Sequence, residues 1–229
     1  MLSAQDLDWL VSVRHHLHAH PELSCEEADT AQYLAERLTE LGLSFESGIG
    51  GHGLVAVIKG NADGPAVGLR ADMDALAISE RTGLAYASRN ADRMHACGHD
   101  GHMTILLGAA MLLSRQRDFA GQVNLVFQPA EERFGGARMM MDDGLLTRFP
   151  MRQIFGLHNW PGVALGEVLV HDGPAMAGTS EFSLTFSAAG GHASTPHLTG
   201  DPLLAGGHFM TGIQQAVARA VDPMESAVV

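Results

Sequence analysis

Helical and strand-like apolar patterns alternate along most of the chain, and this alternation constrains the possible folds more than any other feature. Short branched apolar runs bounded by turn residues predict strands over residues 54–58, 66–69, 123–127 and 154–157. Apolar residues at helical spacing predict helices over residues 7–18, 26–41, 104–115 and 135–142. This order is typical of an α/β fold, in which helices cover both faces of a mostly parallel sheet.

The pattern changes near Ala177. Phe182, Leu184 and Phe186 alternate with polar residues, which predicts a half-exposed strand. A helix is expected from Pro202 to about residue 220, and residues 226–229 resemble the start of another strand. We therefore expect a first domain over residues 1–177 and an incomplete α+β domain over residues 178–229.

One thiol, three imidazoles and one carboxylate lie within the short glycine-containing segment of residues 94–102. Cys97 and His99 are two residues apart, and thiolate and imidazole are ligands that borderline-soft divalent metals prefer. Alternatively, Cys97 is a small buried apolar side chain and the histidines are hydrogen-bonded structural groups. The density of ligands favours a metal site, whereas the roles of His95 and His102 stay open.

Further candidate ligands follow the predicted strands. Asp72 and Asp74 follow the 66–69 strand, and His158 follows the 154–157 strand. Glu131 and Glu132 follow the 123–127 strand, and adjacent carboxylates repel each other unless a cation or a proton separates their roles. A solvated pair at a helix start is the alternative. Because strand ends converge in α/β sheets, we expect these residues to form one site with Cys97.

Composition excludes several classes of partner. The chain has 14 Lys plus Arg against 26 Asp plus Glu, a net charge of -12, which argues against nucleic acid and anionic membranes. The longest apolar run, residues 105–113, is too short to span a bilayer, and the first residues do not resemble a secretion signal. Two cysteines cannot form a disulfide framework, and a thiolate at Cys97 requires reducing conditions, so we expect a cytoplasmic protein.

Three segments carry a family resemblance: residues 14–24 (Arg-His-His-Leu-His-Ala-His-Pro-Glu-Leu-Ser), residues 68–76 (Gly-Leu-Arg-Ala-Asp-Met-Asp-Ala-Leu) and residues 191–194 (Gly-His-Ala-Ser). With the 94–102 segment, they resemble the metal-dependent amidohydrolases and peptidases, specifically the branch of hippurate hydrolases, N-acyl-amino-acid amidohydrolases and auxin-conjugate hydrolases. The resemblance implies a catalytic domain and a lid domain that forms a homodimer when complete. It also implies that this chain ends inside the lid.

The resemblance assigns a role to each candidate. Cys97 is expected to bridge two divalent metal ions (Zn, Mn, Co or Ni), with His99, Glu132 and His158 as further ligands and Glu131 as the general base. Asp74 is expected to orient a ligand, and His192 to stabilise the oxyanion in the active site of a partner subunit. A fifth ligand, a histidine, is expected beyond residue 229.

These roles imply hydrolysis of the amide bond of a small N-acyl amino acid. A dipeptidase or carboxypeptidase of the same superfamily is an alternative, and a truncated metal-binding remnant without activity is another. A Cys97 nucleophile with His99 as its base is disfavoured, because residues two apart on a tight loop rarely present the required geometry. The histidines at 15, 16, 18 and 20 are interpreted as structural.

Overall fold

The computed structural model describes the whole chain except residues 174, 177 and 179. It contains two compact units, Met1–Gly162 and Val163–Val229, which are described separately below. The domain boundary expected at residue 177 falls on a residue outside those described.

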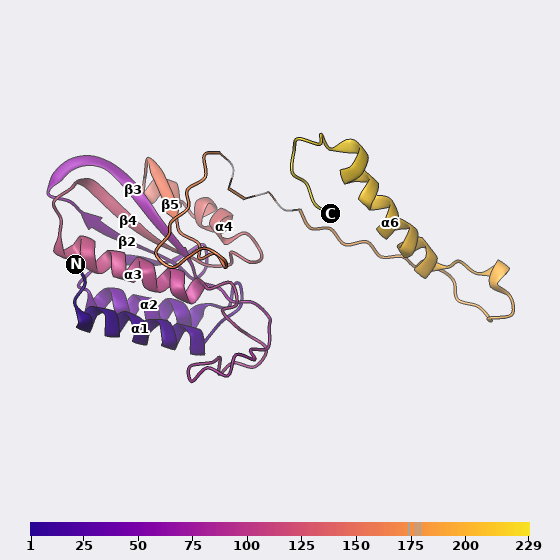
Figure 1. Cartoon of the computed structure of the whole chain (residues 1–229), viewed down its shortest axis with the longest axis horizontal. Coiled ribbons are helices and arrows are strands. Elements are labelled where there is room, and N and C mark those ends of the chain that lie inside the picture. Colours follow the sequence, from indigo (N-terminus) through magenta and orange to yellow (C-terminus); the bar gives the residue numbers. More distant parts are fainter. Residues whose placement is uncertain (174, 177, 179) are drawn as a thin grey trace. The chain divides into compact units, whose positions relative to one another are not determined.

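A five-stranded sheet forms the centre of the first unit (Figure 1). Its strands are β1 (Phe45–Ile49), β2 (Gly53–Lys59), β3 (Ala62–Asp72), β4 (Ala120–Gln128) and β5 (Gln153–Gly156), in the order β1-β2-β4-β3-β5. β3 runs parallel to β4 and β5, whereas β2 runs antiparallel to β1 and β4. The α/β class is confirmed, but the sheet is mixed rather than mostly parallel. A tight turn joins β1 to β2, and such a short connection can join only antiparallel neighbours.

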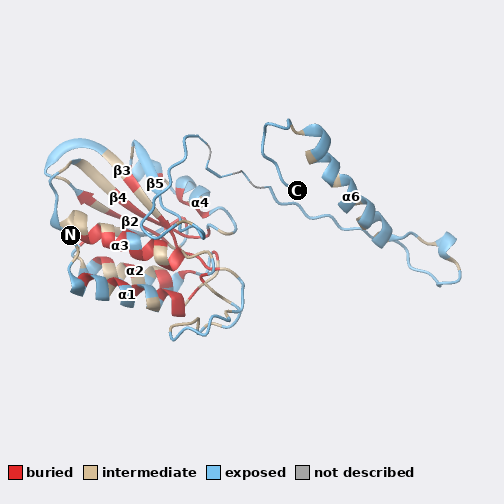
Figure 2. Cartoon of the chain, viewed as in Figure 1, coloured by how far each residue is buried: buried red, intermediate tan, exposed pale blue. Residues whose placement is uncertain are grey.

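Helices cover both faces of this sheet, and side chains alternate between the two faces. On one face, α1 (Ala4–Ala19), α2 (Ala28–Glu40) and α3 (His99–Arg115) pack against Leu54, Ala56 and Ile58 of β2. On the other face, Val55 packs with Met140 of α4 (Gly136–Asp142) and with Leu145 of α5 (Leu145–Arg148). Figure 2 shows the resulting buried layer along the sheet and the inward sides of the helices.

α3 begins earlier than its apolar pattern predicts. Gly98 is the N-cap with a left-handed φ of 98°, and the N–H groups of Gly101 and His102 donate to its carbonyl oxygen. The helix predicted over residues 104–115 therefore begins five residues earlier, and Gly101 lies within its first turn. The first turn of α3 thus carries His99, two residues after Cys97.

Local interactions join α1 to α3. The Ser3 hydroxyl accepts the Asp6 N–H at 3.2 Å, and the Asp6 carboxylate accepts the Ser3 N–H at 2.8 Å, which is a capping box. The same carboxylate accepts two hydrogen bonds of 2.7 Å from the Arg115 guanidinium at the end of α3. α3 is therefore anchored at the end opposite to His99.

The second unit contains α6 (Pro202–Ala220) and a short 3-10 helix (Pro196–Leu198). The Asp201 side chain accepts the Leu204 N–H at 2.9 Å, so the predicted start of this helix is confirmed. The strands predicted over residues 182–186 and 226–229 are absent, because the described residues of this unit offer no neighbouring strand with which to pair. No helix among the described residues is long and apolar enough to cross a membrane.

Candidate metal centre

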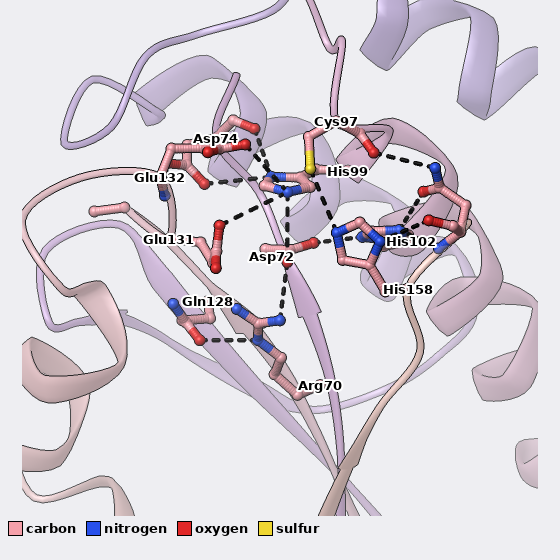
Figure 3. Close-up of polar contacts among 12 residues, drawn as sticks. Arg70, Asp72, Asp74, Cys97, His99, His102, Gln128, Glu131, Glu132 and His158 are labelled. Atoms are coloured by element: carbon pink, nitrogen blue, oxygen red, sulfur yellow. Dashed lines mark hydrogen bonds and ion pairs between the residues drawn. The ribbon is translucent and has the colours of Figure 1, made fainter. Parts of the chain in front are cut away.

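The candidate ligands meet where β3, β4 and β5 end (Figure 3). Asp72 on β3 lies opposite Gln128 on β4, and Arg70 on β3 lies opposite Gly156 on β5. The chain leaving these strands supplies the other side chains, and the first turn of α3 faces the same edge. The site is therefore assembled at the carboxyl edge of the parallel part of the sheet, where α/β folds place their ligands.

His99 is at the centre of this site and is fully buried. Its Nδ1 lies 2.8 Å from the backbone carbonyl oxygen of Asp74, which can only accept, so Nδ1 carries the proton and donates. Nε2 of the neutral ring is then left with a lone pair. It lies 3.5 Å from the Asp72 carboxylate, 3.7 Å from Glu132 and 4.0 Å from Glu131. The ring is thus oriented as a metal-binding histidine with a backbone partner on its other nitrogen.

The charges around His99 favour a cation. Burial by itself lowers the pKa of His99, but the contact of its Nδ1 with the Asp74 carboxylate at 3.4 Å and the charge of Asp72 together raise that pKa above its ordinary value. Three carboxylates near one buried imidazole concentrate negative charge at Nε2. A proton or a metal ion at this position would offset that charge.

Cys97 and His158 form the second part of the site. The Cys97 Sγ lies 3.4 Å from His158 Nε2. His158 Nδ1 lies 2.7 Å from the carbonyl oxygen of Asn159, to which it donates, so Nε2 is free to act as a ligand beside the sulfur.

The thiol of Cys97 needs a cation to ionise. Burial, followed by the negative charge of Glu132 and Asp72, raises the pKa of Cys97 to about 12. A neutral thiol is a poor nucleophile, so these surroundings count against Cys97 acting alone as the attacking group. A bound divalent metal would deprotonate the thiol, because a coordinating thiol loses its proton to the metal.

The residues present fit a divalent metal. His99 belongs to three groups whose ligand atoms lie within 4.8 Å of one another, and these groups are Cys97, His99 and His158; His99, Glu131 and Glu132; and Asp72, His99 and His102. Among the residues that the structure describes, buried His99 Nε2 and Glu132 Oε1 have no hydrogen-bond partner. Unpartnered buried nitrogen and oxygen atoms beside a thiol are a donor set expected of a divalent metal site.

His102 is held by protein groups on both ring nitrogens. Nδ1 lies 2.6 Å from the Asp72 carboxylate, and Nε2 lies 3.1 Å from the backbone N–H of Asn159 and contacts the side chain of the same residue. His95 is buried apart from the three groups, and burial lowers its pKa to about 4. The structure thus gives His102 a supporting position between Asp72 and Asn159, and it gives His95 none in the site.

Asp74 connects two of the candidate residues. Its Oδ2 accepts the Ser24 hydroxyl at 2.6 Å and the Glu132 N–H at 2.9 Å, while its backbone carbonyl accepts from His99. The orientation role expected of Asp74 remains a prediction, and these contacts support it.

Glu131 borders the site without being enclosed by it, with 38% of its side chain exposed. Partial burial, followed by the negative charge of Asp72 and Glu132, raises the pKa of Glu131. A carboxylate with a raised pKa that is still reached by solvent has the properties of a general base.

Three supporting residues, Ser24, Arg70 and Asn159, were missed in the sequence. Ser24 binds Asp74, and Arg70 donates to both Asp72 and Gln128 at 2.8 Å. The Asn159 amide donates to the carbonyl oxygen of Cys97 at 3.1 Å. Asn159 is adjacent to His158, Arg70 is two residues from Asp72, and Ser24 belongs to the 14–24 segment. These positions were the only signals in the sequence that could have identified them.

Gly98 allows the Cys97 segment to approach the segment after β5. A Cβ atom at Gly98 would lie 2.4 Å from Asn159 Oδ1, and the φ of 98° is itself strained for other residues. Glycine is therefore required here for two independent reasons.

His192 belongs to the second unit, in which it is exposed and its Nδ1 lies 2.8 Å from the Ser194 hydroxyl. The structure brings together Asp74, Cys97, His99, Glu131, Glu132 and His158, all within the first unit. The catalytic role of His192 stays a prediction.

Comparison with known proteins places the chain in a family. The family model for peptidase family M20/M25/M40 matches residues 68–227, and the chain therefore belongs to this family. It is 42% identical over 220 residues to an N-acetyl-L-cysteine deacetylase of Bacillus subtilis, covering 96% of this chain and 52% of that protein. It is 44% identical over 218 residues to a hippurate hydrolase of Campylobacter jejuni, covering 95% and 56%.

A solved structure supports the same assignment. A Bacillus subtilis protein described as a dinuclear metal-binding peptidase of the M20 family superposes with a TM-score of 0.67 at 40% identity, covering 70% of this chain and 45% of that one. The family resemblance drawn from the sequence is thus confirmed. The chain spans about half the length of the curated relatives that it matches.

Proposed function

We propose that this chain provides the metal-binding half of an amidohydrolase that cleaves N-acyl amino acids into a carboxylic acid and an amino acid. The observation that carries the proposal is the meeting of Cys97, His99 and His158 beside Glu131 and Glu132 at one sheet edge. The names of the two relatives, a deacetylase of N-acetyl-L-cysteine and a hippurate hydrolase, support an N-acyl amino acid as the substrate class.

Two divalent metal ions would be held by Cys97, His99, Glu132 and His158. When bound, such ions supply the Lewis acidity that makes water acidic near neutral pH and polarises a carbonyl group.

The remaining steps belong to residues of this chain. Glu131 would accept a proton from the attacking water and deliver it to the amine nitrogen as the carbon–nitrogen bond breaks. Asp74 would keep Nε2 of His99 directed into the site through the hydrogen bond from Nδ1 to its carbonyl oxygen. His192 would stabilise the oxyanion in a homodimer formed through the lid. The reduced thiol required at Cys97 supports a cytoplasmic location.

The test is a hydrolysis panel of hippurate, N-acetyl amino acids, auxin conjugates and dipeptides. The chain would be stripped with a chelator and reloaded separately with Zn, Mn, Co or Ni, and metal content would be measured by elemental analysis. We expect metal-dependent release of the amino acid from N-acyl substrates in preference to dipeptides.

Two variants make the result specific. Glu131→Gln should bind metal without turnover, and exposed Glu26→Gln should behave as the wild type. Stoichiometric metal without hydrolysis of any amide by the wild-type chain would contradict the proposal and favour the metal-binding remnant.

A further inference from the structure

The segment that precedes α2 contacts the candidate site from a distant part of the sequence. The Glu22 carbonyl oxygen accepts the Ala75 N–H at 2.8 Å, and the Ser24 hydroxyl donates to Asp74 at 2.6 Å. Glu27 lies two residues after Cys25, and its carboxylate accepts the N–H of Ala130 at 2.7 Å. This segment therefore touches both of the strand ends that carry carboxylates.

Glu27 is an unusual residue for its position. It is the N-cap of α2, yet its side chain makes no capping hydrogen bond to that helix and is completely buried. Its Oε2 has no hydrogen-bond partner among the described residues. Burial raises the pKa of Glu27, and the N–H of Ala130 offsets part of that effect. A buried carboxyl group with one unpartnered oxygen costs folding free energy, so the contact with Ala130 needs a reason.

The backbone of Ala130 is strained, and this strain explains why the contact with Glu27 is useful. The Ala130 φ of 51° lies in the left-handed region, which is unfavourable for a residue with a Cβ atom. Its side chain is fully buried, and its carbonyl oxygen accepts the N–H of Gly136 at 2.8 Å. Both peptide groups of Ala130 are thus held by hydrogen bonds, and its conformation sets the direction in which the chain continues to Glu131 and Glu132.

We propose that Glu27 is a positioning residue that holds the turn at Ala130 in its left-handed conformation and thereby aims Glu131 and Glu132 into the site. The proposal deepens the amidohydrolase function and rests on it for the catalytic effect. The hydrogen bond itself spans 103 residues of sequence, so it joins the start of α2 to the loop between β4 and α4.

The test compares two neutral replacements of similar size in the full 229-residue chain. Glu27→Gln keeps an oxygen that can accept the Ala130 N–H, whereas Glu27→Met fills the space without an acceptor. Glu26→Met, at an exposed neighbour, controls for the substitution itself. Glu27→Asp withdraws the carboxylate by one methylene and provides the same measurement should Glu27→Met fail to fold.

The first measurement is hydrogen exchange at the Ala130 amide, which requires no activity. We expect exchange to be at least about tenfold faster in Glu27→Met than in the wild type, and close to the wild-type rate in Glu27→Gln and Glu26→Met. Unchanged exchange in Glu27→Met, or in Glu27→Asp if that variant replaces it, would overturn the proposal.

The second measurement separates positioning from stability. With a substrate from the panel and saturating metal, we expect Glu27→Met to lower kcat at least about tenfold with KM unchanged, and Glu27→Gln to retain kcat within about threefold. Equal losses in both variants would overturn the acceptor role. If the wild-type chain hydrolyses nothing, the amidohydrolase proposal fails, and the exchange measurement still decides whether Glu27 holds the turn.

Discussion

The two units of this chain use their apolar residues in opposite ways. In Met1–Gly162, two buried clusters line the two faces of the sheet, and large side chains such as Leu107 and Phe127 are fully buried. In Val163–Val229, α6 contains no buried residue, and Leu204 is 58% exposed. Figure 2 shows this difference for each unit.

This difference shows which elements of secondary structure can form from local sequence signals alone. α6 forms because a helix satisfies its own backbone hydrogen bonds and Asp201 caps it. The strand predicted over residues 182–186 does not form, because a strand needs a partner to satisfy its backbone groups. The candidate metal centre, which depends on side chains that follow several strands, therefore lies in the unit that contains the sheet.

The largest effect is expected at the site. Glu131→Gln should lower kcat by about 100–10,000-fold, because a glutamine amide cannot accept the proton from water. KM and metal content should change little. Steady-state kinetics with elemental analysis would check this, and a kcat within a few-fold of the wild type would exclude Glu131 as the base.

His192→Ala tests whether the second unit takes part in catalysis. We expect kcat to fall about 100–1,000-fold, because one oxyanion donor is lost, while the metal content stays unchanged. His197→Ala is the matched control in the same unit. Equal activities of the two variants would confine the chemistry to Met1–Gly162.

Matched leucine substitutions test the difference in burial. Leu107→Ala should lower the free energy of unfolding by about 2–5 kcal/mol, because it leaves a cavity in the core. Leu204→Ala on α6 should change it by less than about 0.5 kcal/mol. Denaturant titration of each variant would measure both, and a large loss at Leu204 would show that this side chain is covered in solution.

The cap of α6 should matter only to the second unit. Asp201→Ala removes the acceptor for the Leu204 N–H and should destabilise α6 by about 1 kcal/mol. Asp201→Asn, which also caps helices, should retain most of the stability. Circular dichroism would follow helix content. A change in the unfolding of the first unit would contradict the expectation that the cap of α6 affects the second unit alone.

The smallest effect is a pH dependence at the junction of α1 and α3. The Arg115 guanidinium, followed by the backbone and hydroxyl groups of Ser3, holds the pKa of Asp6 well below its usual value of 3.8. The contribution of ionised Asp6 to folding stability is therefore complete at pH values above the pKa of Asp6 in the unfolded state. It is lost as the pH falls toward the lower pKa of Asp6 in the folded state.

Asp6→Asn should consequently reduce the loss of thermal stability on acidification. Melting temperatures of both proteins between about pH 6 and about pH 3 would measure this. Equal slopes for the variant and the wild type would show that Asp6 does not contribute to acid sensitivity.

The predictable part of the fold is the part encoded locally. Helical periodicity located α1 and α2, and branched apolar runs located β2, β4 and β5. β1 was missed because Phe45–Ile49 contains polar residues and a glycine with φ of 81°, and its pairing with β2 is shifted there. Strand direction was mispredicted for β2, because nothing in its own sequence specifies which neighbour it pairs with.

The candidate site likewise contains some residues that local sequence identifies and others that only the fold reveals. Residue chemistry singled out Cys97 and His99, since a thiol and imidazoles are uncommon together. Ser24, Glu27 and Asn159 are ordinary residue types, and their contacts lie 50, 103 and 62 residues away. No local pattern distinguishes such residues, so only the fold reveals them.

The strand order has a consequence for how the protein is made. β2 and β3 are separated in sequence only by Gly60 and Asn61, but β4 lies between them in the sheet (Figure 1). During synthesis, both strands leave the ribosome well before their shared neighbour, and the nascent chain must keep a gap between them open. We expect the central ladder to close late and slowly, which exposes an apolar intermediate to chaperones until the last residues of β4 emerge.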